Sequence, residues 1–212
     1  MALVVLVVTI SMAVGTGRGQ PRSSDVLRVR GLIIEDRDGR ERILLGAPVP
    51  KVTGRKRADD VTGLVVLGDK GADRVQIGNV GGPQIRGVLK QRKSGSVGIT
   101  VNDPNGDERG GFGVLDNGRV VLGLDYAERE AVSLFVMPDE GFAGLKVTGE
   151  HGAGFERIGL VVNNKTGKAL MKLADTNDSE RMMVEVEGQT PARLLVIDPT
   201  TGRRDVLEKL RP

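Results

Sequence analysis

The chain has 212 residues, 39% hydrophobic and 28% charged, so it is long enough for one large domain and apolar enough to bury a core. A formal net charge of only +3, with four phenylalanines, one tyrosine and no tryptophan, argues against a nucleic-acid binder, which uses basic stripes and stacking rings. The absence of cysteine excludes disulfides, a cysteine nucleophile and thiolate metal ligands.

Residues 1–17 have the composition of a signal peptide or a membrane anchor. The apolar run Ala2–Val14 has the length of a signal-peptide core and is shorter than the roughly 20 residues of a membrane span. Ala13 and Gly15 are small residues two positions apart, as at a cleavage site, but no Lys or Arg precedes the run. We expect export with cleavage, with an uncleaved anchor or a buried strand as alternatives, and a linker over residues 18–25.

Beyond the linker, the sequence repeats a hairpin pattern. In "VNDPNGDER", Asp103 can accept backbone N–H groups across a turn, Pro104 presets φ, and Gly106 supplies the positive φ that closes the turn. Aliphatic runs of period two flank these turns, which is typical of strands. The same turn chemistry recurs at residues 36–39, 116–118, 163–167 and 198–202.

We therefore expect residues 26–212 to form one all-β domain, an antiparallel hairpin-repeat meander. A curved sheet, a sandwich or a prism-like stack all fit this pattern, and a closed barrel is the alternative because closure removes exposed edges. Residues 47–60 and 80–96 are rich in Gly, Pro, Lys and Arg. Both segments are expected to be exposed loops.

An arginine follows several turn glycines by three positions, at Arg42, Arg74, Arg109 and Arg157. We expect each arginine on the solvent side of the sheet, beside a turn aspartate or a carboxylate of the neighbouring strand. A row of arginines that binds a polyanion is the alternative. The acidic residues near each arginine argue against it.

The repeated string "aliphatic run, D-x-x-G-x-x-R, aliphatic run, Gly" covers most of residues 31–210. It resembles uncharacterised bacterial exported proteins built from repeated D-x-x-G-x-x-R β-hairpins. The resemblance implies an exported β protein. It implies no activity and no functional residues.

The sequence predicts no catalytic residue, no metal ligand and no cofactor. His151 is the only histidine and lies in "GEHGAGFER", where neighbouring glycines favour an exposed loop. No serine lies in a nucleophile elbow, and "NNKTGKAL" has the wrong spacing for a phosphate-binding loop. The adjacent acids Asp59-Asp60 and Asp139-Glu140 are expected to be solvated.

Calcium is a candidate ligand for the oxygen-rich strings of the sequence, and an anionic surface is a candidate ligand for its basic strings. The oxygen-rich strings "DRDGRE", "DPNGDE" and "DTNDSE" lack the spacing of an EF-type loop, and hairpin turns use the same residues without an ion. The basic strings "KVTGRKR" at 51–57 and "KQRK" at 90–93 could contact anionic lipid or wall polymer, but short clusters of this kind on Gly/Pro loops are more often solubilising charge.

We therefore expect a non-enzymatic, exported structural or protein-interaction module. The alternatives are a hydrolase with a site near His151, and an adhesion module that binds calcium or an anionic surface. A protein partner or self-association is expected at a sheet edge, because an open meander leaves unpaired N–H and C=O groups there. The weakly charged strand 192–198 is preferred over residues 27–34 as this edge, although the charged tail after residue 202 could cover it.

Overall fold

The computed structural model describes residues 27–206 apart from positions 93, 152–155 and 199. The predicted signal or anchor at 1–17 and the linker at 18–25 lie outside these residues. Over the part of the chain that is described, the fold is all-β, as predicted. These residues include no helix with the length and apolar character needed to cross a membrane.

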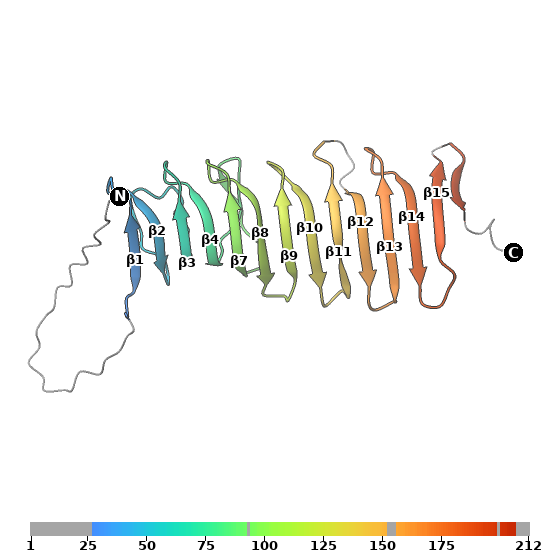
Figure 1. The fold of residues 1–212 in the computed structure, drawn as a ribbon, viewed down its shortest axis with the longest axis horizontal. Helices are drawn as coiled ribbons and strands as arrows, with labels where there is room; N and C mark the ends of the chain where they lie inside the picture. Colours follow the sequence, from blue (N-terminus) through green and yellow to red (C-terminus); the bar gives the residue numbers. More distant parts are fainter. Residues whose placement is uncertain (1–26, 93, 152–155, 199, 207–212) are drawn as a thin grey trace, which may run out of the picture.

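Fourteen strands form one sheet, and two short strands form a small hairpin beside it (Figure 1). The first half of the sheet consists of β1 (Gly31–Glu35), β2 (Glu41–Gly46), β3 (Thr62–Leu67), β4 (Asp73–Asn79), β7 (Ser96–Asn102), β8 (Glu108–Leu115) and β9 (Val120–Asp125). The second half consists of β10 (Glu130–Met137), β11 (Phe142–Thr148), β12 (Glu156–Asn163), β13 (Lys168–Ala174), β14 (Glu180–Glu187), β15 (Arg193–Asp198) and β16 (Gly202–Asp205). The separate hairpin consists of β5 (Gln84–Ile85) and β6 (Val88–Leu89).

The sheet is a simple antiparallel meander, as the sequence predicts. Each strand pairs with its neighbours in chain order, apart from the step from β4 to β7 across the small hairpin. β1 and β16 lie at opposite ends of the strand order, so the sheet is open and does not close on itself. Figure 1 shows the strands from β1 to β15 standing nearly upright side by side, as one layer.

The C-terminal strand corrects the expectation of a free edge at residues 192–198. β16 pairs antiparallel with β15, with Leu195 opposite Asp205 and Asp198 opposite Gly202. The chain segment that follows the turn thus covers the donors and acceptors of β15. The terminal strands of the sheet are β1 and β16.

The aspartate turns are built as predicted, and those after β1, β7 and β13 share one rim, the upper rim in Figure 1. The Asp36 carboxylate accepts the backbone N–H groups of Asp38 at 2.9 Å and Arg40 at 3.1 Å. The Asp103 carboxylate accepts those of Asn105 and Asp107 in the same way. Gly106 has a φ of 94°, which confirms the predicted positive φ at that turn.

Each of the predicted turn arginines lies at a point where the pairing register shifts. Arg42, Arg74, Arg109 and Arg157 are the extra residues of β-bulges, which free them from ladder pairing. Arg109 pairs with Asp103 of its own turn at 2.7 Å, and Arg42 pairs with Asp36 at 3.0 Å. These two confirm the expected aspartate contact.

The other bulge arginines reach the next hairpin instead. The Arg74 Nε donates to the carbonyl of Asn102 at 3.0 Å, and the Arg157 Nε donates to the carbonyl of Ala174 at 2.9 Å. Arg42 adds a second contact of this kind, to Asp69 in the turn after β3. The arginines thus tie successive hairpins together along the rim, and the polyanion-binding row is wrong for these four positions.

Near the opposite rim, a row of six mutually paired glycines crosses the first strands. Gly31, Gly46, Gly63, Gly78, Gly98 and Gly113 lie opposite one another in register. A Cβ on Gly46 would lie 2.4 Å from the carbonyl oxygen of Pro48. Without side chains in this row, the 47–61 segment can turn back closely over the sheet.

The segment over residues 47–61 provides the only cluster of buried apolar side chains among the described residues. Val49 and Val61 pack on Leu44, Val65 and Leu67 from β2 and β3. The segment 47–60 is a loop, as expected, but it is exposed only in part: Lys51 and Lys56 are exposed, whereas Val49 and Arg57 are buried. Over 80–96 the expectation holds only in part: Val80 and Ser96 are buried, whereas Val88 and Leu89 are exposed.

We expect Gly63→Ala to lower the free energy of unfolding by about 3 kcal/mol, since it combines backbone strain with a collision. Gly63 has a φ of +146°, and its Cβ would lie 1.9 Å from the carbonyl oxygen of Ile77. Gly113→Ala, in the same row, is the matched control because its nearest contact would be an ordinary 3.7 Å. Urea denaturation compares the two, and equal midpoints would contradict the backbone assigned to Gly63.

Candidate functional site

One face of the sheet is apolar from end to end, and we call it the apolar face. Residues that pair across antiparallel strands point to the same side, so the register identifies each face. The central row of the apolar face runs unbroken from β1 to β15: Leu32, Leu45, Leu64, Ile77, Ile99, Phe112, Leu122, Leu134, Leu145, Leu160, Met171, Val184 and Leu194.

Two further rows flank the central row on the same face. The row nearer the aspartate turns comprises Ile34, Ile43, Val66, Val75, Val101, Gly110, Leu124, Val132, Val147, Ile158, Leu173, Met182 and Val196. The row nearer the other rim comprises Thr62, Asn79, Val97, Val114, Val120, Val136, Ala143, Val162, Ala169 and Val186. None of the residues in the three rows is charged.

Large side chains of this face are exposed to solvent. Leu124 on β9 is 57% exposed and Leu134 on β10 is 49% exposed, and Phe112 on the neighbouring strand β8 is 46% exposed. With about 4.8 Å between strands and about 3.3 Å per residue, the face measures about 55 Å by about 20 Å, or about 1,000 Å². Contiguous apolar patches of more than a few hundred Å² mark interaction sites.

The face also carries a shallow hollow towards its C-terminal end. Leu145, Leu160, Met171 and Val184 line it, with a volume of about 520 Å³. Aliphatic side chains with no ionisable group cannot donate or accept protons in a reaction. The apolar face can therefore bind another apolar surface, and it offers no acid–base chemistry.

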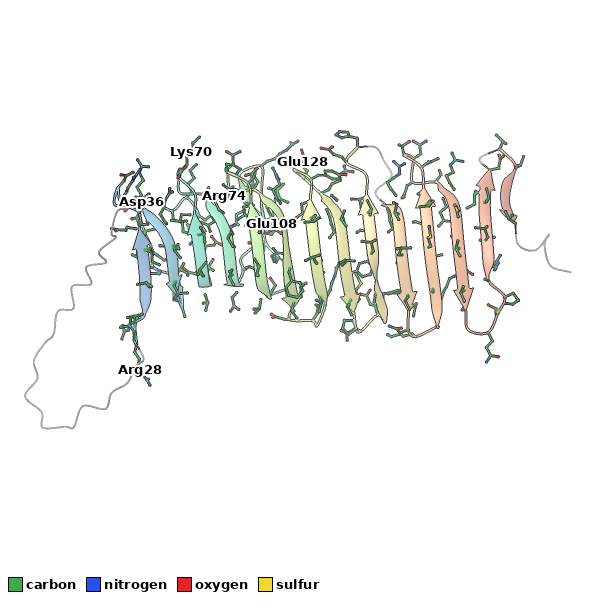
Figure 2. All side chains as sticks on the ribbon, in the orientation of Figure 1. Arg28, Asp36, Lys70, Arg74, Glu108 and Glu128 are labelled. Carbon is green, nitrogen blue, oxygen red and sulfur yellow. The ribbon has the colours of Figure 1, made fainter. Side chains whose placement is uncertain are left out.

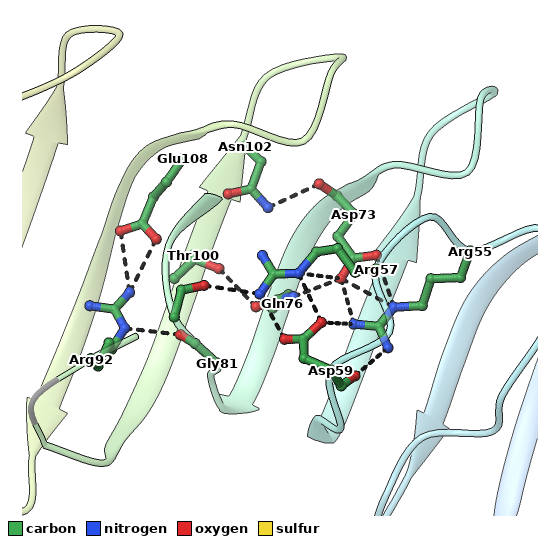
Figure 3. Close-up of polar contacts among 11 residues, drawn as sticks. Arg55, Arg57, Asp59, Asp73, Gln76, Gly81, Arg92, Thr100, Asn102 and Glu108 are labelled. Carbon is green, nitrogen blue, oxygen red and sulfur yellow. Dashed lines mark hydrogen bonds and ion pairs between the residues drawn. The ribbon is translucent and has the colours of Figure 1, made fainter. Parts of the chain in front are cut away.

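The opposite face, which we call the polar face, carries a buried ion-pair network under the 47–61 segment (Figure 3). Asp73 begins β4 and is completely buried. The Arg55 guanidinium donates two hydrogen bonds to the Asp73 carboxylate, from Nε to Oδ1 at 3.0 Å and from Nη2 to Oδ2 at 2.8 Å. The Gln76 amide donates to the same carboxylate at 2.6 Å, and the Asn102 amide donates to the Asp73 carbonyl at 2.9 Å.

A second aspartate joins both arginines of the segment. Arg57 donates to the Asp59 carboxylate from Nε at 2.9 Å and from Nη2 at 2.7 Å, and to the carbonyl of Gly82 at 2.9 Å. Burial raises the pKa of the Asp59 carboxyl, but the Arg57 hydrogen bonds and the nearby Arg55 charge outweigh it and lower the pKa overall. The network is satisfied internally and fixes the segment on the sheet.

The basic strings named by the sequence are thus not free to bind anionic lipid as units. Arg55 and Arg57 of "KVTGRKR" are buried in this network. Arg92 of "KQRK" pairs with Glu108 at 3.1 Å and donates to the carbonyl of Gly81. The adjacent acids Asp59 and Asp60, both expected to be solvated, lie in different surroundings. Asp59 is part of the network, whereas the Asp60 carboxylate lies at the surface, 3.6 Å from the Lys51 ammonium.

A small acidic hollow of about 140 Å³ lies beside this network on the polar face. Asp125 lies directly opposite Glu130 in the ladder, and Glu108 lines the same hollow. Burial, together with the charges of Glu108 and Glu130, raises the pKa of Asp125 to about 6. Lys146 at 3.0 Å and the Ser133 hydroxyl at 2.8 Å both contact Glu130. The hollow can hold a proton near neutral pH.

His151, the centre of the hydrolase alternative, does not line this hollow. Its side chain is 88% exposed at the tip after β11, with Glu150 at 3.7 Å. The structure therefore does not bring His151 together with Glu108, Asp125 and Glu130. The predicted loop exposure of His151 is confirmed.

The oxygen-rich turn strings use their leading aspartates inside the turns. Asp36, Asp103 and Asp175 each accept two backbone N–H groups of their own turn. These bonds, and the arginine beside each aspartate, lower the pKa of all three carboxyls. Within the described residues, no three His, Cys, Asp or Glu side chains gather as a metal site.

Sequence reasoning missed the apolar face and the roles of Asp73 and Asp125. The face was detectable in principle, because every predicted strand has aliphatic residues at alternate positions. The two aspartates gave no signal, because each stands where a turn or strand-end aspartate is ordinary. Comparisons of the chain with family models, with curated proteins and with solved structures found no match.

We expect Asp73→Ala to lower the free energy of unfolding by about 3–5 kcal/mol, because it leaves the buried Arg55 charge and the Gln76 amide without their partner. Asp69→Ala is the control. Asp69 also pairs with an arginine, Arg42, but is 81% exposed, so its loss should cost at most about 1 kcal/mol. Similar urea midpoints for both variants would show that the Asp73 network does not hold the segment.

The raised pKa of Asp125 makes stability depend on pH in a defined direction. Its carboxyl titrates at 3.8 in an unfolded chain and at about 6 in the folded one. Between these values the unfolded state loses the proton first, so the contribution of Asp125 to stability falls as pH rises from about 4 to about 6 and is constant outside that window. Asp125→Asn should therefore unfold at higher urea than the parent near pH 7, with no such gain near pH 4.

Asp198→Asn provides a control of opposite sign. Hydrogen bonds from the Thr200 hydroxyl and from the Thr200 and Thr201 amides lower the Asp198 pKa to about 2. Its stabilising effect is present above the unfolded value and is lost as pH falls. The variant should therefore be less stable than the parent near pH 7. A gain there for Asp198→Asn, or none for Asp125→Asn, would contradict the electrostatics described.

Proposed function

We propose that the protein is a non-enzymatic, exported structural or interaction module that presents its apolar face to another protein. The observation that carries the proposal is the solvent exposure of three apolar rows along the length of the sheet. An interface between proteins is built around an apolar, uncharged centre with a polar rim. This face has that pattern.

Charged side chains surround the apolar face without entering it. Figure 2 places Asp36, Lys70 and Glu128 at the upper rim, where the turns lie. Bulge arginines such as Arg109 also belong to this rim and are paired with acids there. Such paired charges favour solubility and orientation more than affinity.

The polar face supports a scaffolding role. Its buried groups are engaged with one another: Asp73 with Arg55, and Asp59 with Arg57. Charges used in this way stabilise a surface segment and are not available to bind a substrate. On the polar face, these ion pairs thus hold the 47–61 segment in place over the N-terminal half of the sheet.

Export is proposed from the composition of residues 1–17. Cell fractionation, with sequencing of the N-terminus of the recovered protein, tests it. We expect the protein outside the cytoplasm, beginning after Gly15 or a nearby residue. Recovery of the whole chain from the cytoplasm would contradict export.

Site-specific photo-crosslinking in the native cell tests the interaction role. A photoreactive residue at Leu134, at the centre of the apolar face, should give covalent adducts with protein. The same residue at Leu89 of β6 is the control, since Leu89 is as exposed but lies off this face. No adduct at Leu134 beyond the level at Leu89 would overturn the proposal.

A further inference from the structure

The geometry points to a second copy of this chain as the occupant of the apolar face. We propose that two copies pack face to face through their apolar faces, as the two layers of a sandwich. The inference rests on the proposed interaction role and names the partner. It differs from edge association, because side chains and not backbone groups make the contact.

The size of the apolar face matches what a stable interface needs. At about 1,000 Å², it exceeds the roughly 800 Å² per partner of a standard protein–protein interface. Within the described residues no second large sheet covers this area, since the fourteen strands follow one another in one open order. A second sheet packed about 10 Å away would bury the three rows.

The shape and chemistry of the face suit a copy of itself. Flat sheets of many strands are unusual and are typically stabilised by stacking on another sheet. The strands here stand nearly upright from β1 to β15 (Figure 1). The three rows hold mostly aliphatic residues of moderate size, with one aromatic, Phe112, and two uncharged polar residues, Thr62 and Asn79, so two such faces interdigitate without placing a charge in the interface.

A two-fold axis that lies between the two sheets and runs parallel to their central strands makes the contact isologous. Phe112, Leu122 and Leu134 lie on the adjacent strands β8, β9 and β10 near the centre of the order. In a two-fold pair whose axis runs along the strands at β9, Leu122 packs against Leu122 of the second copy, and Phe112 packs against its Leu134. Residues near β1 pack against those of the C-terminal strands.

A lipid surface is the less suitable occupant. Surfaces that lie on membranes flank their apolar residues with unpaired lysines and arginines that attract anionic headgroups. Along this rim the cations are matched by acids: Arg109 pairs with Asp103 and Arg181 with Asp175, and the exposed Arg37 and Lys70 are adjacent in sequence to aspartates. The rim therefore lacks the excess positive charge that membrane binding uses.

Sedimentation equilibrium of the exported protein, compared with Leu134→Glu, tests the inference. The parent should have twice the mass of the chain. Leu134→Glu would place a charge at the centre of the interface and should shift the mass to that of one chain, because a desolvated unpaired charge is not tolerated there. Leu89→Glu should leave the double mass unchanged, although Leu89 is 46% exposed against 49% for Leu134.

Circular dichroism of Leu134→Glu separates dissociation from unfolding. A β spectrum with the mass of one chain supports the inference. If that variant unfolds, Val136→Thr provides a milder change on the same face and should weaken association about tenfold or more. A parent of single-chain mass up to the highest soluble concentration overturns the inference, and so does a parent that associates equally after both leucine changes.

Photo-crosslinking at Leu134 distinguishes this inference from the wider proposal. Adducts of two identical chains support both. Adducts with a different protein, from a parent that sediments as one chain, overturn self-association and leave the interaction role standing. A single-chain parent that binds vesicles of anionic lipid through Leu134 overturns both.

Discussion

The whole structure depends on the pairing of each hairpin with the next through backbone hydrogen bonds. A single layer has no opposing sheet, so the ladder itself holds β1 to β16 in order. Arg42, Arg74 and Arg157 strengthen three of the junctions, as when Arg74 reaches the carbonyl of Asn102 in the following hairpin. This construction extends the sheet without enclosing a core. Apolar side chains on both faces must therefore be covered by other means.

The two faces differ in what covers their apolar side chains. On the polar face, the 47–61 segment folds back and buries Leu44 and Val65, while Arg55 fixes the segment to Asp73. Glycines in the row beneath, such as Gly46, allow that close approach. On the apolar face, no described segment of the chain performs this role, and Leu124 and Leu134 remain exposed. The hydrophobic effect therefore favours association over that face.

Much of the fold was predictable because turn chemistry and strand periodicity are local. Asp103, Pro104 and Gly106 identify a hairpin without reference to any other part of the chain, and the meander follows from repeating it. The fate of residues 47–60 was not predictable, because their composition suits a solvated loop. Their burial depends on Asp73 and Gln76, which lie in another hairpin.

The apolar face, too, was predictable only as far as it depends on local sequence. Alternate aliphatic residues predicted that each strand has one apolar side. They did not reveal whether a second layer of the same chain would cover those sides, since that depends on the path of the whole meander. The raised pKa of Asp125 likewise comes from burial and from the charge of Glu108, which lies 17 positions away in sequence but lines the same hollow.

Small-angle X-ray scattering of the purified protein tests the central claim, an open sheet whose apolar face is covered by another molecule of its kind. The account predicts an elongated particle about 60 Å or more in length, with a cross-section as thick as two sheets whose backbones lie about 10 Å apart. A compact particle with a radius of gyration of about 17 Å, as for a globular chain of this length, would contradict it. In that case the chain buries its apolar face within itself.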